Sequence, residues 1–339
     1  MKRREFLHAT ATVAGLTLLG SSRETQAAGI ADQYANLDSS KYLGELKTLA
    51  KVEDTKIFTE GPCCDRAGNV YFTNTEVAKI LKWDGKQLTT YRENSGAANG
   101  LLFDKQGRLV ACEGNAGRVT RTDMSSGKIE ILCDQYGGHP LGAPNDLCFD
   151  GQGRIYFTSR LPNMDATKGN VNSVYRIDPD GKTQRVVHAP EIHMPNGIVT
   201  SPDDTILYLI ESAPAADQNR CILAFDLDAS GNLSKPRKLI DFYPGRSGDG
   251  MAIDERGNLY VAAGLHATRK TSETLDTRPG IHVISPQGQL LAFVQTPEDT
   301  ITNCRFGGAD LKTLYITCGK QLLSVTTKTA GKSSYRPGK

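Results

Sequence analysis

The sequence predicts an all-β fold, a six-bladed β-propeller with four-stranded blades. Three observations support this prediction. One hairpin pattern recurs six times, a second hairpin follows it within the repeating unit, and the periodicity of amphipathic helices is absent. The 34 glycines are about 10% of the 339 residues, against a usual level of about 7%, and this excess fits many tight turns better than long helices.

The recurring hairpin is clearest in residues 248–263. A polar start leads into a short apolar run, residues 254–257 form a tight turn, and residues 258–263 return as a second strand. Every copy opens on a polar residue, which we call its marker residue. The six marker residues are Glu60, Asn99, Asn145, Asn196, Asp249 and Asn303. They lie 39 to 54 residues apart, a spacing typical of propeller blades.

The second hairpin supplies two further strands to each unit. In the first unit, residues 79–83 turn through Asp84 and Gly85 into a strand at residues 87–92. Four strands in each of six units predict a propeller with six blades.

The last unit lacks its fourth strand, because the chain after residue 326 is polar and rich in Gly, Lys and Ser. We expect residues 46–52, just before the first unit, to take that place and close the ring, leaving few exposed strand edges. The propeller is therefore assigned to residues 46–326 and a polar C-terminal tail to residues 327–339.

Residues 1–28 predict an export signal rather than part of the fold. Basic residues at 2–4 are followed by Phe6-Leu7, a moderately apolar stretch and the small pair Ala27-Ala28. The apolar stretch is shorter than the about 20 residues that span a bilayer. The paired arginines resemble a twin-arginine signal, which implies a periplasmic or secreted protein; a Sec signal or a disordered tail is the alternative. Residues 29–45 are expected to be a linker.

Composition and cysteine spacing exclude several function classes. The net charge of +2, with both signs interspersed, predicts no nucleic-acid partner, no anionic-membrane surface and no membrane span. The eight cysteines show no C-x-x-C spacing, so a zinc site is not expected. Several lie in apolar strand-like runs, which favours buried thiols over a disulfide framework. Nothing in the sequence indicates an oligomeric state.

The marker residues are the candidate functional residues, because the innermost strand of each blade lines the central channel and equivalent positions converge there. Two carboxylates and four amides would present oxygen atoms to a common point. Calcium takes six to eight oxygen ligands, and two carboxylates balance its charge. Another divalent cation is an alternative, although Mg²⁺ fits less well and the lack of His and Cys disfavours Zn²⁺. Because Asn, Asp and Gly are also the commonest turn residues, simple turn chemistry is the competing interpretation.

Four of the unit openings also carry a family resemblance. Residues 58–62 (Phe-Thr-Glu-Gly-Pro), 144–146 (Pro-Asn-Asp), 195–197 (Pro-Asn-Gly) and 248–251 (Gly-Asp-Gly-Met) resemble the gluconolactonase/regucalcin family of six-bladed propeller lactonases. The resemblance implies that Glu60, Asn145, Asn196 and Asp249 bind calcium. It also implies a catalytic role for Asp249.

The activity implied by the resemblance is calcium-dependent hydrolysis of a small-molecule lactone, with a sugar acid lactone as the expected substrate. The cation would polarise the lactone carbonyl. Asp249 would orient or deprotonate the attacking water, or act as a nucleophile. Two alternatives stay open: a non-enzymatic ligand- or protein-binding propeller with structural calcium, and esterase or phosphotriesterase activity in the same site.

Substrate binding is where the sequence departs from the family. Related lactonases often carry an arginine two residues before the amide at the Asn145 position, and this sequence has Ala143 there. We expect Arg160, just past the second strand of the same unit, to take over that role. The other expected substrate-binding residues are Asn99, Asn145 and Asn303.

Overall fold

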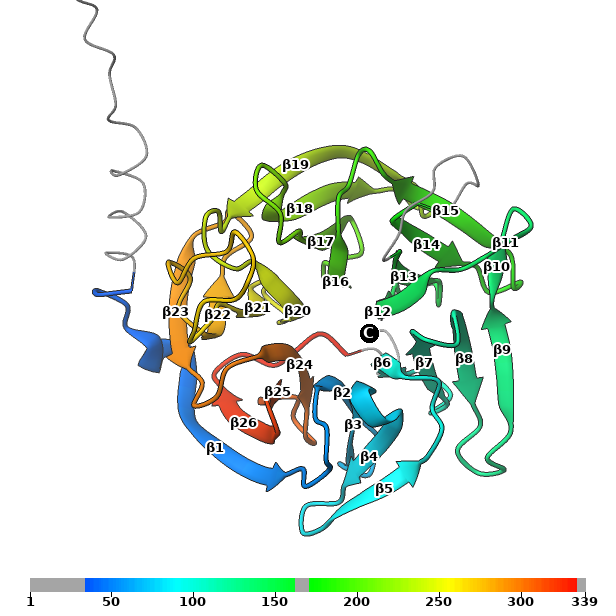
Figure 1. The fold of residues 1–339 in the computed structure, drawn as a ribbon, viewed down its shortest axis with the longest axis horizontal. Coiled ribbons are helices and arrows are strands. Elements are labelled where there is room, and N and C mark those ends of the chain that lie inside the picture. Colours follow the sequence, from blue (N-terminus) through cyan, green and yellow to red (C-terminus); the bar gives the residue numbers. More distant parts are fainter. Residues whose placement is uncertain (1–33, 162–170, 334–339) are drawn as a thin grey trace, which may run out of the picture.

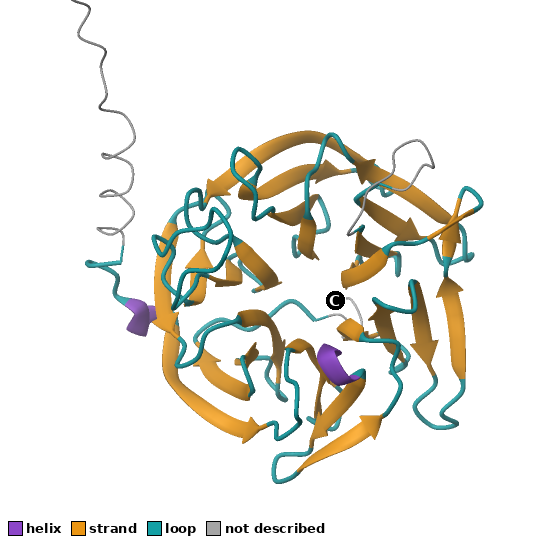
Figure 2. Ribbon diagram, viewed as in Figure 1, coloured by secondary structure: helices purple, strands orange, loops and turns teal. Residues whose placement is uncertain are grey.

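The computed structural model describes residues 34–161 and 171–333, which form a six-bladed β-propeller around a central channel (Figure 1). The predicted export signal, residues 1–28, lies outside the described residues. Helical structure in the described part is limited to two single 3₁₀ turns, η1 (Ser39–Lys41) and η2 (Thr75–Val77), against the many strands seen in Figure 2. None of its helices is long and apolar enough to cross a membrane.

Each blade is a four-stranded antiparallel sheet whose strands follow one another from the channel outward. The strands of blades 1 to 3 are β2 (Thr59–Cys64), β3 (Val70–Asn74), β4 (Lys79–Trp83) and β5 (Leu88–Arg92); β6 (Ala98–Phe103), β7 (Leu109–Glu113), β8 (Arg118–Thr122) and β9 (Ile129–Cys133); and β12 (Ala143–Phe149), β13 (Ile155–Arg160), β14 (Ser173–Ile177) and β15 (Thr183–His188). A two-stranded hairpin of β10 (Gln135–Tyr136) and β11 (His139–Pro140) separates blades 2 and 3.

The remaining blades repeat the same order. Their strands are β16 (Pro195–Thr200), β17 (Ile206–Ser212), β18 (Arg220–Leu227) and β19 (Leu233–Asp241) in blade 4; β20 (Gly248–Ile253), β21 (Leu259–Ala263), β22 (Gly280–Ile284) and β23 (Leu290–Gln295) in blade 5; and β24 (Ile301–Gly307), β25 (Thr313–Cys318), β26 (Gln321–Thr327) and β1 (Leu43–Lys51) in blade 6.

The ring closes as the sequence predicts, because β1 from the start of the chain pairs antiparallel with β26 from its end. Pairing runs from Leu43 opposite Thr327 to Lys51 opposite Gln321, so the closing strand starts three residues before the expected residue 46. Within the expected linker, Tyr34 also contacts the propeller. Its hydroxyl lies 2.8 Å from His282 Nε2 in blade 5.

Burial explains why the sequences of the inner strands are continuous runs of apolar or small residues. Every residue of β20 and β21 is buried, because these strands pack between neighbouring blades, whereas most of the outer strand β9 is exposed. The eight cysteines are buried free thiols, which confirms the prediction made from their positions in apolar runs.

The turns between first and second strands share a local hydrogen-bond pattern. In the turn of blade 5, Asp254 Oδ1 accepts the N–H groups of Arg256 and Asn258 at 2.9 Å, and Gly257 takes a left-handed φ of 85°. Equivalent turns begin at Asp65, Asp104 and Asp150. The repeated sequence of these turns therefore serves the scaffold. The turns lie at the end of each inner strand that is opposite to the marker residue.

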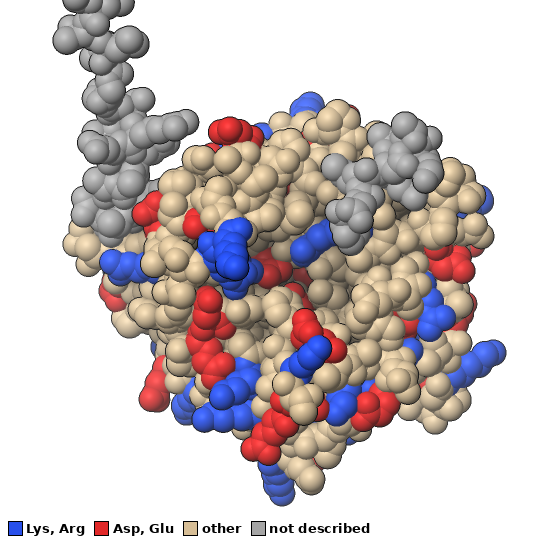
Figure 3. All heavy atoms as spheres, in the orientation of Figure 1, with Lys and Arg blue, Asp and Glu red and all other residues tan. Residues whose placement is uncertain are grey.

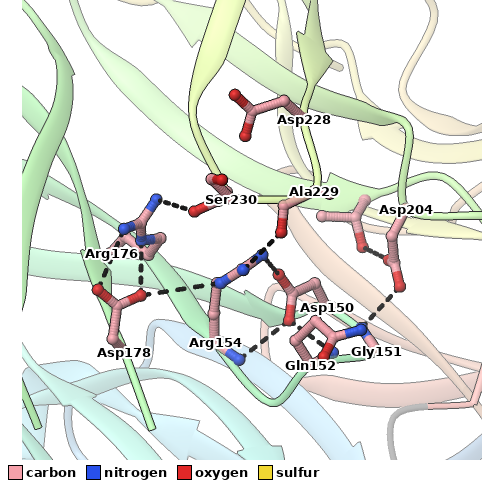
Figure 4. A network of polar contacts seen from close by, with 12 residues as sticks. Asp150, Gly151, Gln152, Arg154, Arg176, Asp178, Asp204, Asp228, Ala229 and Ser230 are labelled. Carbon is pink, nitrogen blue, oxygen red and sulfur yellow. Dashed lines mark hydrogen bonds and ion pairs between the residues drawn. The ribbon is translucent and has the colours of Figure 1, made fainter. Parts of the chain in front are cut away.

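Charged side chains tie neighbouring blades together at this turn end (Figure 4). Arg154 forms an ion pair with Asp150 at 3.1 Å and donates to the carbonyl oxygen of Ala229 at 2.7 Å. Arg176 donates to the carbonyl oxygen of Ser230 at 3.0 Å. Blade 3 is thus fastened to the loop between β18 and β19 of blade 4.

The chain beyond β26 crosses the same end of the channel, which corrects the expectation of a simple polar tail for its described part (Figure 1). The Lys332 N–H donates to the Ile253 carbonyl oxygen at 2.9 Å. The Lys332 ammonium donates to the carbonyl oxygen of Ser201 at 2.8 Å and also contacts Asp204. An added Cβ on Gly331 would lie 2.1 Å from Phe306 Cγ, so this segment is closely packed. We call residues 328–333 the crossing segment.

Candidate active site

All six marker residues lie in the innermost strands, not in turns, so turn chemistry does not explain them. In every inner strand the pairing register with the second strand shifts at or beside the marker residue. Such an irregularity re-aims a side chain relative to the regular alternation of a strand. The six shifts therefore account for polar side chains gathered at one end of the channel.

The glycines that follow four of the marker residues allow the inner strands to approach one another. An added Cβ would lie 2.1 Å from the Asn99 carbonyl oxygen at Gly61, 2.7 Å from the Asp249 carbonyl oxygen at Gly197, and 2.1 Å from Asn303 Cγ at Gly250. Any side chain at these positions would push neighbouring blades apart at the level of the marker residues.

Contacts across the channel connect marker residues from different blades. Asn303 Nδ2 lies 3.3 Å from Glu60 Oε2 and 3.3 Å from Asp146 Oδ2. Glu60 Oε2 also accepts the Gly61 N–H at 3.1 Å. Asn303, expected to bind substrate, therefore holds two carboxylates of the channel with its amide group.

Asp249 lies between two arginines. Arg246 Nη2 donates to its Oδ2 at 2.6 Å, and Arg160 Nη2 lies 3.9 Å from its Oδ1. Arg160 is held by the Pro195 carbonyl oxygen, which accepts from its Nε at 3.0 Å. In the sheet, Arg160 pairs directly opposite Ala143, the position where related lactonases often carry arginine. The structure thus places the Arg160 side chain beside the carboxylate of Asp249, one of the two acidic marker residues.

Two of the marker residues, Asn99 and Asn145, line a cavity of about 440 Å³ at this end of the channel. Its lining includes Thr75, Glu76, Asn99, Asn115, Asn145 and Arg160. Among the described residues, Asn99 Oδ1 and Arg160 Nη2 are buried polar atoms without a hydrogen-bond partner. Figure 3 shows acidic and basic side chains close together around the central hollow of this face. Two residues of the cavity lining thus carry polar atoms whose hydrogen-bonding capacity the described residues do not use.

Burial and charge act together on the ionisable groups of the channel. Burial raises the pKa of Glu60 well above its usual value, and the charges of Asp249 and Asp146 raise it further. Burial also raises the pKa of Asp146, while the Arg305 guanidinium, 3.6 Å away, lowers it. Burial lowers the pKa of Arg160. The channel therefore concentrates carboxylates that a cation would stabilise.

The oxygen atoms of Glu60, Asn145, Asn196 and Asp249 match the ligands that Ca²⁺ prefers. All four side chains belong to buried residues, and Asn196 Nδ2 donates to Ser212 Oγ at 3.0 Å, which orients its amide. Within residues 34–161 and 171–333, no three His, Cys, Asp or Glu side chains form a metal-binding group. A cation at this site would therefore depend on the amide oxygens as well as the carboxylates, and the donor set fits a hard cation.

Sequence reasoning missed three charged residues of the channel: Asp146, Arg246 and Arg305. All three carry a signal that comparison of the units could have found. Asp146 stands where four other units have glycine, and Arg246 is an arginine three residues before its marker residue, where no other unit has Lys or Arg. Arg305 stands two residues after its marker residue, where the other five units have Pro, Leu, Leu, Ile and Met.

Comparison with known proteins agrees with this geometry. A family profile described as the SMP-30/gluconolactonase/LRE-like region matches residues 58–320, which include all six marker residues. A gluconolactonase from Zymomonas mobilis is 28% identical over 304 residues, covering 81% of this chain and 80% of that protein. A regucalcin from Danio rerio is 33% identical over 283 residues, covering 81% of this chain and 87% of that protein. The solved structure of a gluconolactonase from Xanthomonas campestris matches with a TM-score of 0.70 and 29% identity, over 85% of this chain and 92% of that one.

Proposed function

Because this chain belongs to the SMP-30/gluconolactonase/LRE-like family, we propose that it is a lactonase that hydrolyses a sugar acid lactone with Ca²⁺ as cofactor. Two observations support the proposal: Glu60, Asn145, Asn196 and Asp249 are all buried in inner strands, and the charge of Asp249 acts on Glu60, while Asn145 also lines the cavity. These four residues would hold the cation.

A Ca²⁺ ion bound there would polarise the lactone carbonyl and stabilise the negative charge that develops on its oxygen. The residues of the chain itself would orient the attacking water relative to the lactone carbonyl. Asp249 Oδ1 is the carboxylate oxygen not held by Arg246, so it would accept a hydrogen bond from the attacking water and direct it at the carbonyl carbon.

The unpaired polar atoms of the cavity favour a hydroxylated substrate. Asn99 Oδ1 can accept a hydrogen bond from a sugar hydroxyl, and Arg160 Nη2 can donate one to a ring oxygen or hydroxyl. Leaving the Asn99 amide oxygen unpaired costs about 1–3 kcal/mol, so a ligand that pairs with it is favoured over an aliphatic lactone.

The test uses purified protein, glucono-1,5-lactone and an aliphatic lactone of similar size, with and without EGTA. We expect faster turnover of the sugar lactone, loss of activity in EGTA and recovery on adding Ca²⁺. Asp249→Asn should lower kcat by about 1,000-fold or more, since it removes a negative ligand and the water acceptor. Asp180→Asn, at an exposed turn of blade 3, is the matched control and should retain activity. Full activity in EGTA would refute the calcium role, and an active Asp249→Asn variant would refute the site.

Export through the twin-arginine route is a separate proposal, supported by the basic pair Arg3-Arg4 and the Phe6-Leu7 that follow. The expected result is mature protein in the periplasmic fraction or the medium. The double substitution Arg3→Lys, Arg4→Lys should keep the protein in the cytoplasm. Export that survives this substitution would point to a different route.

A further inference from the structure

Arg246 lies just before the inner strand of blade 5 and contacts the catalytic candidate directly. Its Nη2 donates to Asp249 Oδ2 at 2.6 Å. Its Nη1 donates to the carbonyl oxygens of Ile301 at 3.1 Å and Gly264 at 3.4 Å. The side chains of Arg246 and Asp249 are each only 9% exposed. The guanidinium therefore ties Asp249 to the segment after β21 and to the start of blade 6.

The regular pairing between β20 and β21 is interrupted around Asp249. Gly248 pairs with Ala263 and Met251 pairs with Val261, so Asp249 lies within the irregularity between two regular pairs. Gly248 and Gly250, its chain neighbours, have no side chain that could lock the orientation. The contact with Arg246 supplies the orientation that regular pairing would otherwise give.

Two other marker residues, Glu60 and Asn196, are oriented by uncharged groups. Glu60 accepts from the Gly61 N–H and from the Asn303 amide, and Asn196 donates to Ser212. Asp249 differs because a guanidinium holds it, so both partners of the contact carry a charge, and Arg–carboxylate pairs are among the strong hydrogen bonds of proteins. The strongest orienting contact in the ring thus falls on the residue that the proposed reaction uses most.

We propose that Arg246 is a positioning residue for lactone hydrolysis, holding Asp249 Oδ2 so that Oδ1 is presented on the side of Arg160. This inference rests on the proposed function for the role of Asp249. The planar guanidinium presents several N–H donors in a fixed fork and can hold one carboxylate and two carbonyl groups together. A lysine ammonium is a single point on a flexible chain and reproduces only part of that arrangement.

The test compares kcat and KM for glucono-1,5-lactone in Arg246→Met, Arg246→Lys, Asp249→Asn and the double variant Arg246→Met/Asp249→Asn. We expect Arg246→Met to lower kcat by about 100-fold while KM changes less than about threefold, because orientation of Asp249 matters at the transition state. Arg246→Lys should recover about tenfold of that loss. The double variant should be less than about threefold slower than Asp249→Asn, because both changes disrupt one unit.

Arg256→Met is the matched control, since Arg256 is an exposed arginine at the turn of the same hairpin. It should leave kcat and KM unchanged. Circular dichroism melting of each variant measures how much of any loss comes from unfolding. An Arg246→Met enzyme with unchanged kcat, or with a loss explained by unfolded protein, would overturn the proposal. So would a double variant in which the two losses multiply.

Calcium binding measured by calorimetry gives a readout independent of turnover. Removing a positive charge near a cation site would by itself strengthen cation binding. An Arg246→Met protein that binds Ca²⁺ about tenfold more weakly therefore indicates that orientation of Asp249 was lost, and unchanged or tighter binding contradicts the proposal. A fully active Asp249→Asn variant would instead refute the proposed function, and the calcium measurement would still decide the role of Arg246.

Discussion

The two ends of the propeller channel are built from the same repeat and differ in how their polar groups are used. At the turn end, Asp254 satisfies the N–H groups of its own turn, and Lys332 contacts several acceptors from blade 4. At the marker end, Asn99 Oδ1 and Arg160 Nη2 are buried and make no hydrogen bond in the described structure, although Arg160 Nη2 lies 3.9 Å from Asp249 Oδ1. Satisfied groups stabilise the scaffold, while unsatisfied groups cost stability and are free to bind a ligand.

The difference arises from the direction in which each inner strand runs. Every inner strand starts with an irregular, polar segment and ends in a tight turn whose hydrogen bonds are local. Repetition by six brings the irregular segments to one end and the tight turns to the other. Substitutions at the marker end should therefore change activity, and substitutions at the turn end should change stability.

After Asp249→Asn, Glu60→Gln should give the largest effect at the marker end. We expect activity to fall by about 100-fold or more, because a ligand of the proposed cation loses its charge. In EGTA the same variant should melt at a higher temperature than wild type, since the substitution removes a buried charge that Asp249 and Asp146 repel. Thermal melting with EGTA and with Ca²⁺, alongside lactone turnover, checks both expectations. A variant that loses stability in EGTA would show that the Glu60 charge is well compensated without a cation.

The pH dependence of folding stability tests whether the scaffold can unfold through a group outside the candidate active site. His282 in blade 5 is buried against Tyr34, Phe242 and Phe293, and burial lowers its pKa to about 4. The unfolded chain titrates near 6.5, so it binds more protons than the folded state between these values. Stability is therefore fully present above pH 6.5 and is lost as the pH falls toward 4, by about 2 kcal/mol at pH 5.

His282→Gln should remove this part of the pH dependence. Urea unfolding at pH 7.5 and pH 5 measures it, and the exposed His139→Gln is the matched control. The Tyr34 hydroxyl faces His282 Nε2, and its pKa is raised to about 12 by burial, so it stays protonated over this range. The Arg278 guanidinium also lies over the Tyr34 ring, 4.6 Å from its centroid. An unchanged pH dependence in His282→Gln would assign acid sensitivity to the channel carboxylates instead.

The fold could be predicted from sequence because its signals are local and repeated. Turn residues, apolar runs and marker spacing each recur, and ring closure by the N-terminal strand follows from counting strands. Within the site, the repeat also predicts that Glu60 and Asp249 share the channel, since equivalent positions in a propeller converge.

The remaining contacts depend on individual residues whose interaction partners the repeat does not predict. Arg246 acts through side-chain length, reaching Asp249 and the backbone of blade 6, and Arg305 reaches Asp146 from a different blade. The amide of Asn303 could equally have faced the cavity, and only the three-dimensional arrangement shows that it lies between Glu60 and Asp146. The sequence predicts a polar tail for residues 327–339, which include the crossing segment, because the chain there is polar and rich in Gly, Lys and Ser.

Lys332→Met should give the smallest effect and should affect stability alone. The ammonium contacts Ser201, Thr200 and Asp204, and the side chains of Lys332 and Asp204 are 19% and 25% exposed, so solvent screens part of their attraction. We therefore expect a loss of about 1 to 2 kcal/mol in the free energy of unfolding, with kcat and KM unchanged. Urea unfolding measures the first quantity and lactone turnover the second. Lys328→Met, an exposed lysine of the same crossing segment, should change neither. If Lys332→Met lowered kcat in fully folded protein, the two ends of the channel would be coupled, and the separation of stability from chemistry along it would be wrong.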